Sequence, residues 1–131
     1  MRQRLLGDEH PDIATSLNNL AMLYKKRKKY RKAKPLYEEA LAMRQQMLGH
    51  EHPDVAASLN NLALLYNEQG QLRKAEPLYR EALMILKQQL GESHPDVAFS
   101  LNNLGKLYTQ QGHYTEAKQL FQEALKLCKD F

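Results

Sequence analysis

The 131-residue chain has one cysteine, no tryptophan and no long apolar run. Cys128 cannot form a disulfide within the chain, which favours a reducing compartment, and we expect the cytoplasm. We expect no transmembrane segment because apolar runs are short, and no secretion signal because residues 1–7 lack an apolar core. Hydrophobic residues make up 43% and charged residues 26%, which excludes wholesale disorder.

Acidic residues are absent from residues 25–34, where eight of the ten positions are Lys or Arg. The whole chain has 19 basic and 15 acidic residues, a net charge of +4. Outside this stretch, 11 basic and 15 acidic residues remain. The positive charge is therefore one local cluster on an otherwise mildly acidic chain.

The tripeptide His-Pro-Asp occurs three times with a period of 42 residues, at His10, His52 and His94. Ser-Leu-Asn-Asn-Leu recurs in the same register, beginning at Ser16, Ser58 and Ser100. A fixed period of this length predicts a repeat architecture. The period divides the chain into a tail of a preceding repeat's second helix (1–9), repeat one (10–51), repeat two (52–93) and a shortened repeat three (94–131).

Each repeat carries two amphipathic stripes, which predict two helices. In repeat two, Leu59, Leu62, Ala63 and Tyr66 lie at helical spacing, and a second stripe runs through residues 72–90. A glycine between the stripes tolerates positive φ and lets the chain reverse. Each unit is therefore predicted to be a helical hairpin.

Proline and glycine mark the expected helix boundaries. In His-Pro-Asp, proline suits the first helical position and the aspartate suits the positive end of the helix dipole. Gly49 and Gly91 are predicted C-terminal caps, as is Gly7 before the first unit. Pro35 and Pro77 fall a few residues into the second helices, so we expect those helices to start late or to bend slightly there.

A single hairpin cannot bury both of its apolar faces, so such units stack on one another. The predicted fold is all-α, a right-handed α-solenoid of stacked antiparallel helix hairpins. We expect the chain to open inside one repeat and to close, at Phe131, without a polar capping helix, as a segment of a longer array does.

The repeat-phased residues are similar to the tetratricopeptide repeat (TPR) signature: Leu59, Leu62, Ala63, Tyr66, Gly70, Leu72, Ala75, Tyr79, Ala82 and Leu83. The period of 42 exceeds the family's usual unit of about 34 residues and resembles the repeat of kinesin light chains. Two positions depart from the pattern. Lys28 replaces the inter-helix glycine of repeat one and Gln119 replaces the second-helix proline of repeat three, so the resemblance does not imply an identical turn in repeat one or an identical bend in repeat three.

The resemblance implies a concave groove, lined by the first helix of each repeat, that holds a peptide. From repeat one the groove would present Thr15, Asn18, Asn19, Met22, Lys25 and Lys26. Repeat two would present Ala57, Asn60, Asn61, Leu64, Asn67 and Glu68. Repeat three would present Phe99, Asn102, Asn103, Lys106, Thr109 and Gln110.

Two hypotheses remain open for the Asn pairs. Their amides can bind a peptide backbone, or they can hydrogen-bond a neighbouring repeat and fix the stacking. Lys25, Lys26 and Lys106 favour an acidic peptide, as does the resemblance to kinesin light chains. The other basic residues of the cluster are expected to serve solubility: Arg27, Lys28, Lys29, Arg31, Lys32 and Lys34.

Other chemistries find little support in the sequence. We expect no metal or cofactor, because Cys128 is alone and His50, His52 and His113 form no ligand motif. No nucleophile has a base placed by a motif, so we expect no enzyme. Tyr30 is the one aromatic residue within the basic cluster, so we expect no nucleic-acid partner.

The sequence therefore predicts a protein-interaction scaffold whose partner is a protein or peptide. The alternative is a structural spacer or self-assembling segment that associates head to tail through uncapped ends.

Overall fold

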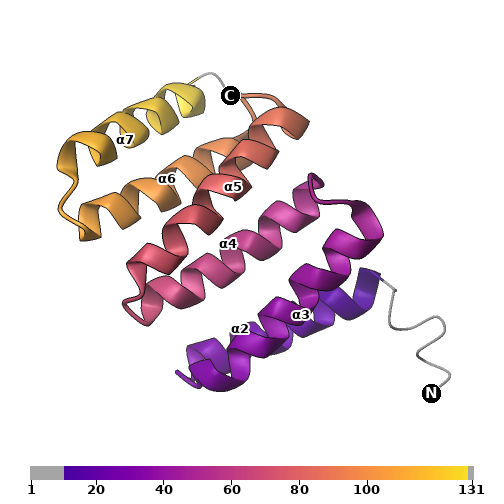
Figure 1. The fold of residues 1–131 in the computed structure, drawn as a ribbon. Helices are drawn as coiled ribbons and strands as arrows, with labels where there is room; N and C mark the ends of the chain where they lie inside the picture. The colour runs from indigo at the N-terminus through magenta and orange to yellow at the C-terminus, as the bar shows by residue number, and fades with distance from the viewer. Residues whose placement is uncertain (1–10, 130–131) are drawn as a thin grey trace, which may run out of the picture.

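The computed structural model describes residues 11–129, which form six helices and no strand (Figure 1). The helices are α2 (Pro11–Lys26), α3 (Tyr30–Leu48), α4 (Pro53–Glu68), α5 (Leu72–Leu90), α6 (Pro95–Gln110) and α7 (Tyr114–Lys129). The expectations for residues 1–9, Gly7, His10 and Phe131 lie outside the described residues.

Consecutive helices pair as antiparallel hairpins, α2 with α3, α4 with α5 and α6 with α7 (Figure 1). Successive hairpins pack through α3 against α4 and through α5 against α6. The arrangement confirms the predicted all-α solenoid. The intra-repeat turns follow one edge of the stack, at the left of Figure 1, and the loops between repeats lie at the opposite ends of the helices.

The His-Pro-Asp motif starts a helix, as predicted, and the histidine itself caps it. Nδ1 of His52 accepts a hydrogen bond of 3.0 Å from the backbone N–H of Asp54. His94 makes the same 3.0 Å contact with the N–H of Asp96 at the start of α6. The cap pairs a backbone donor that the helix itself cannot satisfy.

The turn of repeat one has the same geometry as the turn of repeat two, although Lys28 replaces the glycine there. Lys28 adopts φ +61°, in the left-handed region, where Gly70 has φ +79°. The next N–H closes the turn identically in both repeats: Lys29 donates to Tyr24 O and Gln71 donates to Tyr66 O, each at 2.8 Å. Lysine has a Cβ and therefore strains in this conformation, whereas glycine does not.

The second helices end as predicted, but they do not start late. Gly49 (φ +88°) and Gly91 (φ +90°) cap α3 and α5 at their C-terminal ends. Both helices begin several residues before Pro35 or Pro77 and continue through the proline. The carbonyls that lose a donor belong to exposed residues, four positions earlier, where water can replace the missing N–H.

The core runs between the repeats as well as within them. Tyr37 and Tyr79 are 1% exposed, among small residues such as Ala33 and Ala75. Leu62 and Leu104 of the first helices are buried under the preceding hairpin. Each buried leucine stabilises the stack by roughly 2 kcal/mol, so neighbouring repeats stabilise each other.

Candidate peptide-binding groove

The first helices are linked to one another by a repeated polar contact. Nδ2 of Asn18 in α2 donates to Oγ of Ser58 in α4 at 3.5 Å. The same contact joins Asn60 in α4 to Ser100 in α6 at 3.4 Å. All four side chains are buried or nearly so in the first-helix layer. The first asparagine of each of these two pairs therefore contacts the next repeat, as the stacking hypothesis required, whereas its contact with a ligand stays a prediction.

Asn18 and Asn60 are only partly satisfied by these contacts. Their Oδ1 atoms are buried and have no hydrogen-bond partner within residues 11–129. The second asparagine of each pair is placed differently: Asn19 is exposed, Asn61 is half-buried and Asn103 is buried. Among these, Asn61 combines accessibility with a position beside a pocket.

A pocket of about 240 Å³ lies between α4 and α6. Five residues predicted for the groove line it: Ala57, Asn60, Asn61, Leu64 and Phe99. Leu86 reaches the pocket from α5, so most of the lining is apolar. Phe99 is 58% exposed, so its ring is accessible to a ligand. The pocket can therefore take an apolar side chain of a ligand.

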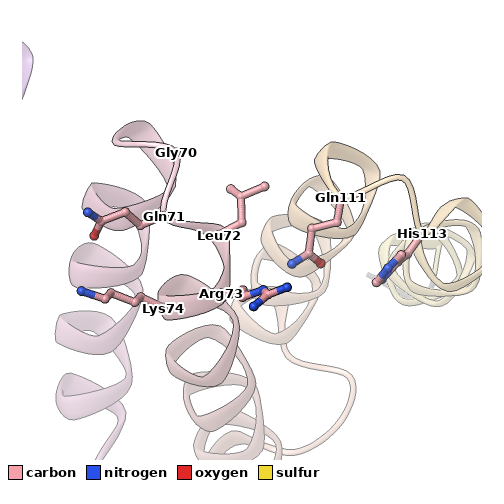
Figure 2. Close-up of a pocket in the computed structure, with 7 residues that line it drawn as sticks. All are labelled: Gly70, Gln71, Leu72, Arg73, Lys74, Gln111 and His113. Carbon is pink, nitrogen blue, oxygen red and sulfur yellow. The ribbon is translucent and has the colours of Figure 1, made fainter.

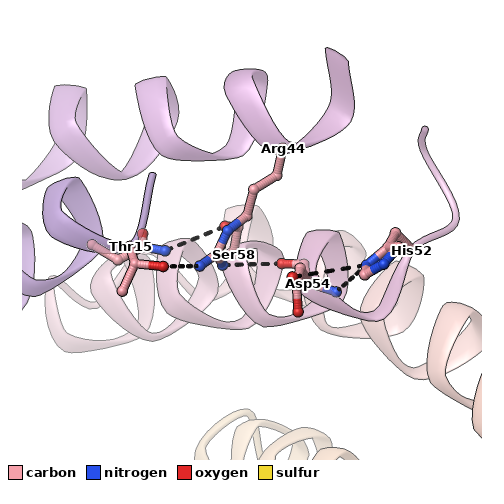
Figure 3. Close-up of polar contacts among 6 residues, drawn as sticks. Thr15, Arg44, His52, Asp54 and Ser58 are labelled. Atoms are coloured by element: carbon pink, nitrogen blue, oxygen red, sulfur yellow. Dashed lines mark hydrogen bonds and ion pairs between the residues drawn. The ribbon is translucent and has the colours of Figure 1, made fainter. Parts of the chain in front are cut away.

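Arg44 of α3 occupies the corresponding place between repeats one and two (Figure 3). Its Nη1 donates to Oγ of Ser58 at 3.0 Å and to the carbonyl of Asp54 at 3.1 Å. Its Nη2 donates to Oγ1 of Thr15 in α2 at 3.3 Å. These contacts fix a guanidinium group between the two first helices and use only part of its donor set.

The period of 42 residues places Arg44 in register with Leu86. The same structural position is thus cationic between repeats one and two and apolar between repeats two and three. Arg44 was not predicted as a groove residue, although the sequence carries a signal for it: a charged residue in the register of the second-helix apolar stripe. Ser58, Leu86 and Asp96 were not predicted for this face either.

The remaining predicted site residues are not gathered into the pocket. Lys25 forms an ion pair of 3.6 Å with Glu68, which reduces its contribution to a basic groove. Asn67 is half-buried on α4 and does not line the pocket. The others lie on the first helices with exposed or half-exposed side chains: Asn19, Met22 and Lys26 on α2, and Asn102, Lys106, Thr109 and Gln110 on α6.

The buried tyrosines Tyr37 and Tyr79 are core residues. Burial raises the pKa of both hydroxyls from 10.0 to about 12, and the negative charge of Glu68 adds to the shift. For Tyr79, the interaction with Asn67 acts in the opposite direction. Neither hydroxyl lines the pocket between α4 and α6.

Within the part of the chain that the structure describes, no three His, Cys, Asp or Glu side chains cluster closely enough to hold a metal ion. Nor does any helix in that part have the length and apolarity needed to span a bilayer.

The sequence profile of the tetratricopeptide repeat matches residues 1–46, 26–88 and 54–130. The chain belongs to the tetratricopeptide repeat family, whose members typically act as protein-interaction scaffolds. No curated protein sequence matches it closely enough to serve as a relative.

Solved structures of kinesin light chain-like proteins have the same fold. BtubC (BKLC) of P. vanneervenii is 30% identical with a TM-score of 0.89, over 98% of this chain and 52% of BtubC. A putative kinesin light chain of Podosopora anserina with nearly identical TPR-like repeats is 29% identical with a TM-score of 0.82, over 91% of this chain and 56% of the other. This chain thus spans about half the length of either protein. The TPR domain of Arabidopsis FLU shares the fold. It is 16% identical, with a TM-score of 0.77, over 92% of this chain and 98% of FLU-TPR.

Proposed function

We propose that the chain binds a peptide segment of a partner protein along the first-helix face and performs no chemistry on it. The observation that carries this proposal is the pocket between α4 and α6, where Phe99 and Leu64 stand beside the Asn60–Asn61 pair. An apolar side chain of the peptide enters the pocket. The half-buried Asn61 amide, with a donor and an acceptor, hydrogen-bonds the peptide backbone.

The same proposal assigns an acidic residue to the peptide, on the side of repeat one. Arg44 supports this assignment because its hydrogen-bond partners among the described residues are neutral oxygens, from Thr15, Asp54 and Ser58. A fixed guanidinium group that faces neutral acceptors retains its full charge for a carboxylate. Exposed Lys26 adds positive charge on the same helix face, whereas Asp96 at the pocket disfavours acidic residues there.

The test is a selection of random peptides on the 131-residue chain, followed by affinity measurement on variants. Phe99→Ser should weaken the selected peptides by about tenfold or more, because a buried apolar contact of roughly 2 kcal/mol is lost. Met84→Ser on α5 is the matched control, since Met84 is 54% exposed and Phe99 is 58% exposed. Equal losses of peptide affinity for both variants would contradict peptide binding at the pocket between α4 and α6.

Arg44→Leu tests the acidic assignment separately. This variant copies Leu86 of repeat two and should therefore fold, while peptides selected for an acidic residue lose their preference over the glutamine version. An unchanged preference for the acidic residue would show that Arg44 does not bind it. That result would not affect the assignment of the apolar pocket.

The second candidate function is self-assembly through the ends of the solenoid. Tyr114 and Leu125 of α7 are 68% and 58% exposed beside a pocket of about 350 Å³. At the other end, Leu20 and Leu23 of α2 are 43% and 52% exposed, although the equivalent leucines of repeats two and three are buried. Light scattering at a series of protein concentrations tests this candidate. A molar mass that rises with concentration in the native chain, but not in Leu125→Glu, would support self-assembly. A constant monomer mass would exclude it.

A further inference from the structure

Among the described residues, a strongly basic surface lies outside the groove, along the edge formed by the intra-repeat turns. We define this basic edge as Arg27, Lys28, Lys29, Arg31, Lys32 and Lys34 from repeat one and Arg73 and Lys74 from repeat two. All but the half-buried Lys34 are exposed. The turns of the two repeats that contribute these residues lie next to each other in the stack (Figure 1).

Tyrosine rings hold three of these lysines and join the two repeats. Lys32 lies over the ring of Tyr24, with Nζ 5.7 Å from the centroid. Lys34 of α3 and Lys74 of α5 both lie over Tyr66, at 5.5 and 5.7 Å. Contact with an aromatic face orients an ammonium group without neutralising its charge. The basic edge is therefore an ordered row of cations that crosses the repeat boundary.

Carboxylates at the same end of the helices do not neutralise this row. Glu68 pairs with Lys25 at 3.6 Å, and Glu76 pairs with Arg80 at 3.0 Å. Neither α3 nor α5 has an acidic residue in its first turn, and their N-terminal residues Lys29 and Gln71 provide no side-chain cap. Basic residues instead begin both helices, at the positive end of each helix dipole.

The basic edge is unfavourable for the isolated fold in three ways. Like charges are concentrated, basic residues stand at helix N-termini, and Lys28 occupies a left-handed position that glycine fills in the other two repeats. An anionic partner would relieve the first two. Next to the edge, a cavity of about 600 Å³ between the turns of repeats two and three gives such a partner room (Figure 2). Arg73 points across it toward Gln111.

We infer that the basic edge is a second binding surface, separate from the groove, for an acidic polypeptide segment rich in Asp and Glu. A short segment matches the edge in extent, because the rest of the chain carries 11 basic and 15 acidic residues and repels a longer polyanion. A nucleic acid duplex or an anionic bilayer extends beyond the edge and meets that acidic surface. Lysine ammonium groups also lie over the rings of Tyr24 and Tyr66, where a stacked base would have to displace them.

The inference does not rest on the proposed groove function, and one binding assay separates the two surfaces. Fluorescence anisotropy of labelled decaglutamate is measured with the full chain at about 50 mM and about 200 mM NaCl. Binding should weaken strongly at the higher salt concentration. The edge variant Arg27→Gln/Arg31→Gln/Arg73→Gln should weaken binding at low salt by about tenfold or more, because three exposed charges that face the probe are removed.

Two control variants decide whether location or total charge matters. Lys106→Gln/Lys118→Gln/Lys126→Gln removes the same charge from repeat three and should change the affinity by less than about threefold. Arg44→Leu, which removes the cation assigned to the groove, should change the affinity for decaglutamate by less than about threefold. A second edge variant, Lys32→Gln/Lys34→Gln/Lys74→Gln, should reproduce the loss while the helical circular dichroism signal is retained.

Three results would overturn the inference. Equal losses for the edge variant and the repeat-three variant would show an effect of net charge alone. Loss of decaglutamate binding in Arg44→Leu would place the probe in the groove. Tighter, edge-dependent binding of a short DNA duplex or of phosphatidylserine-containing vesicles, compared with decaglutamate, would replace the acidic polypeptide by another class of partner.

Discussion

The backbone strain at a single residue of this chain does not follow from the repeat pattern. Lys28 and Gly70 have the same turn geometry although one is lysine and the other glycine. The backbone hydrogen bonds that end α2 and the packing of α3 impose the turn. Lys28 therefore adopts a left-handed conformation that costs energy for a residue with a Cβ. The sequence indicated this position but could not show that packing would override the preference of the residue.

Lys28→Gly should stabilise the chain by about 1 kcal/mol, because glycine adopts positive φ without a Cβ clash. Urea unfolding followed by circular dichroism measures the change. Lys28→Ala removes the same charge and keeps the Cβ, so it serves as the control and should show little or none of the gain. A loss of stability in Lys28→Gly would contradict the strain at this turn.

The buried side chains of Tyr37 and Tyr79 make the free energy of unfolding depend on pH. Their pKa values are raised from 10.0 to about 12 in the folded chain, whereas unfolded tyrosines titrate near 10. Below pH 10 both states are neutral and stability is unaffected. Between pH 10 and 12 the unfolded state ionises first, so stability falls, by on the order of 2 kcal/mol per ring.

Tyr37→Phe should remove about half of this fall, because Tyr79 still contributes. Denaturant unfolding at a series of pH values from 9 to 12 gives the difference between variant and native chain. Tyr114→Phe, in a ring that is 68% exposed, is the control. Identical profiles for the native chain and Tyr37→Phe would show that the Tyr37 hydroxyl does not remain neutral when buried.

At the scale of the helix, capping and register explain which contacts the sequence could predict. The Pro-Asp pair and the period of 42 located the starts of α4 and α6, and the apolar stripe 72–90 located α5. The capping atom was not predicted, because histidine acts here through Nδ1 and is not among the residues that usually cap helices.

His52→Ala should destabilise the chain by about 1 kcal/mol, because the N–H of Asp54 loses its acceptor. His52→Asn should recover most of the loss, since a carboxamide oxygen can accept the same bond. Thermal unfolding of the two variants, with the exposed His50→Ala as a control, measures the effect. Equal destabilisation by alanine and asparagine would show that the imidazole acts through packing alone.

Arg44 shows what a repeat pattern cannot predict within an element. The apolar register predicted a core residue at this position, and Leu86 fulfils that prediction in repeat two. Arg44 instead donates hydrogen bonds to Thr15 and Ser58 on the first-helix face. Only the three-dimensional stack shows that one register position of the second helix reaches the groove, so its chemistry changes from one repeat to the next.

At the scale of the whole molecule, the stack arranges two surfaces of different chemistry. The first-helix face offers an apolar pocket between repeats two and three and a fixed cation between repeats one and two. The turn edge offers a row of lysines and arginines held in part by tyrosine rings. Composition predicted the basic cluster. It could not predict that the cluster continues into repeat two through Tyr66, because that continuity depends on the packing of α3 beside α4.

Nuclear magnetic resonance mapping of the site occupied by a peptide selected on the chain tests the groove most directly. Backbone amide shifts are followed in the 131-residue chain as the peptide is added. The largest changes should fall on α4 around Asn60, Asn61 and Leu64 and on α6 around Phe99, with smaller changes near Ser58 from an acidic residue at Arg44. Changes concentrated on α5 and α7, with none at Asn61 or Phe99, would contradict a peptide-binding groove on the first-helix face.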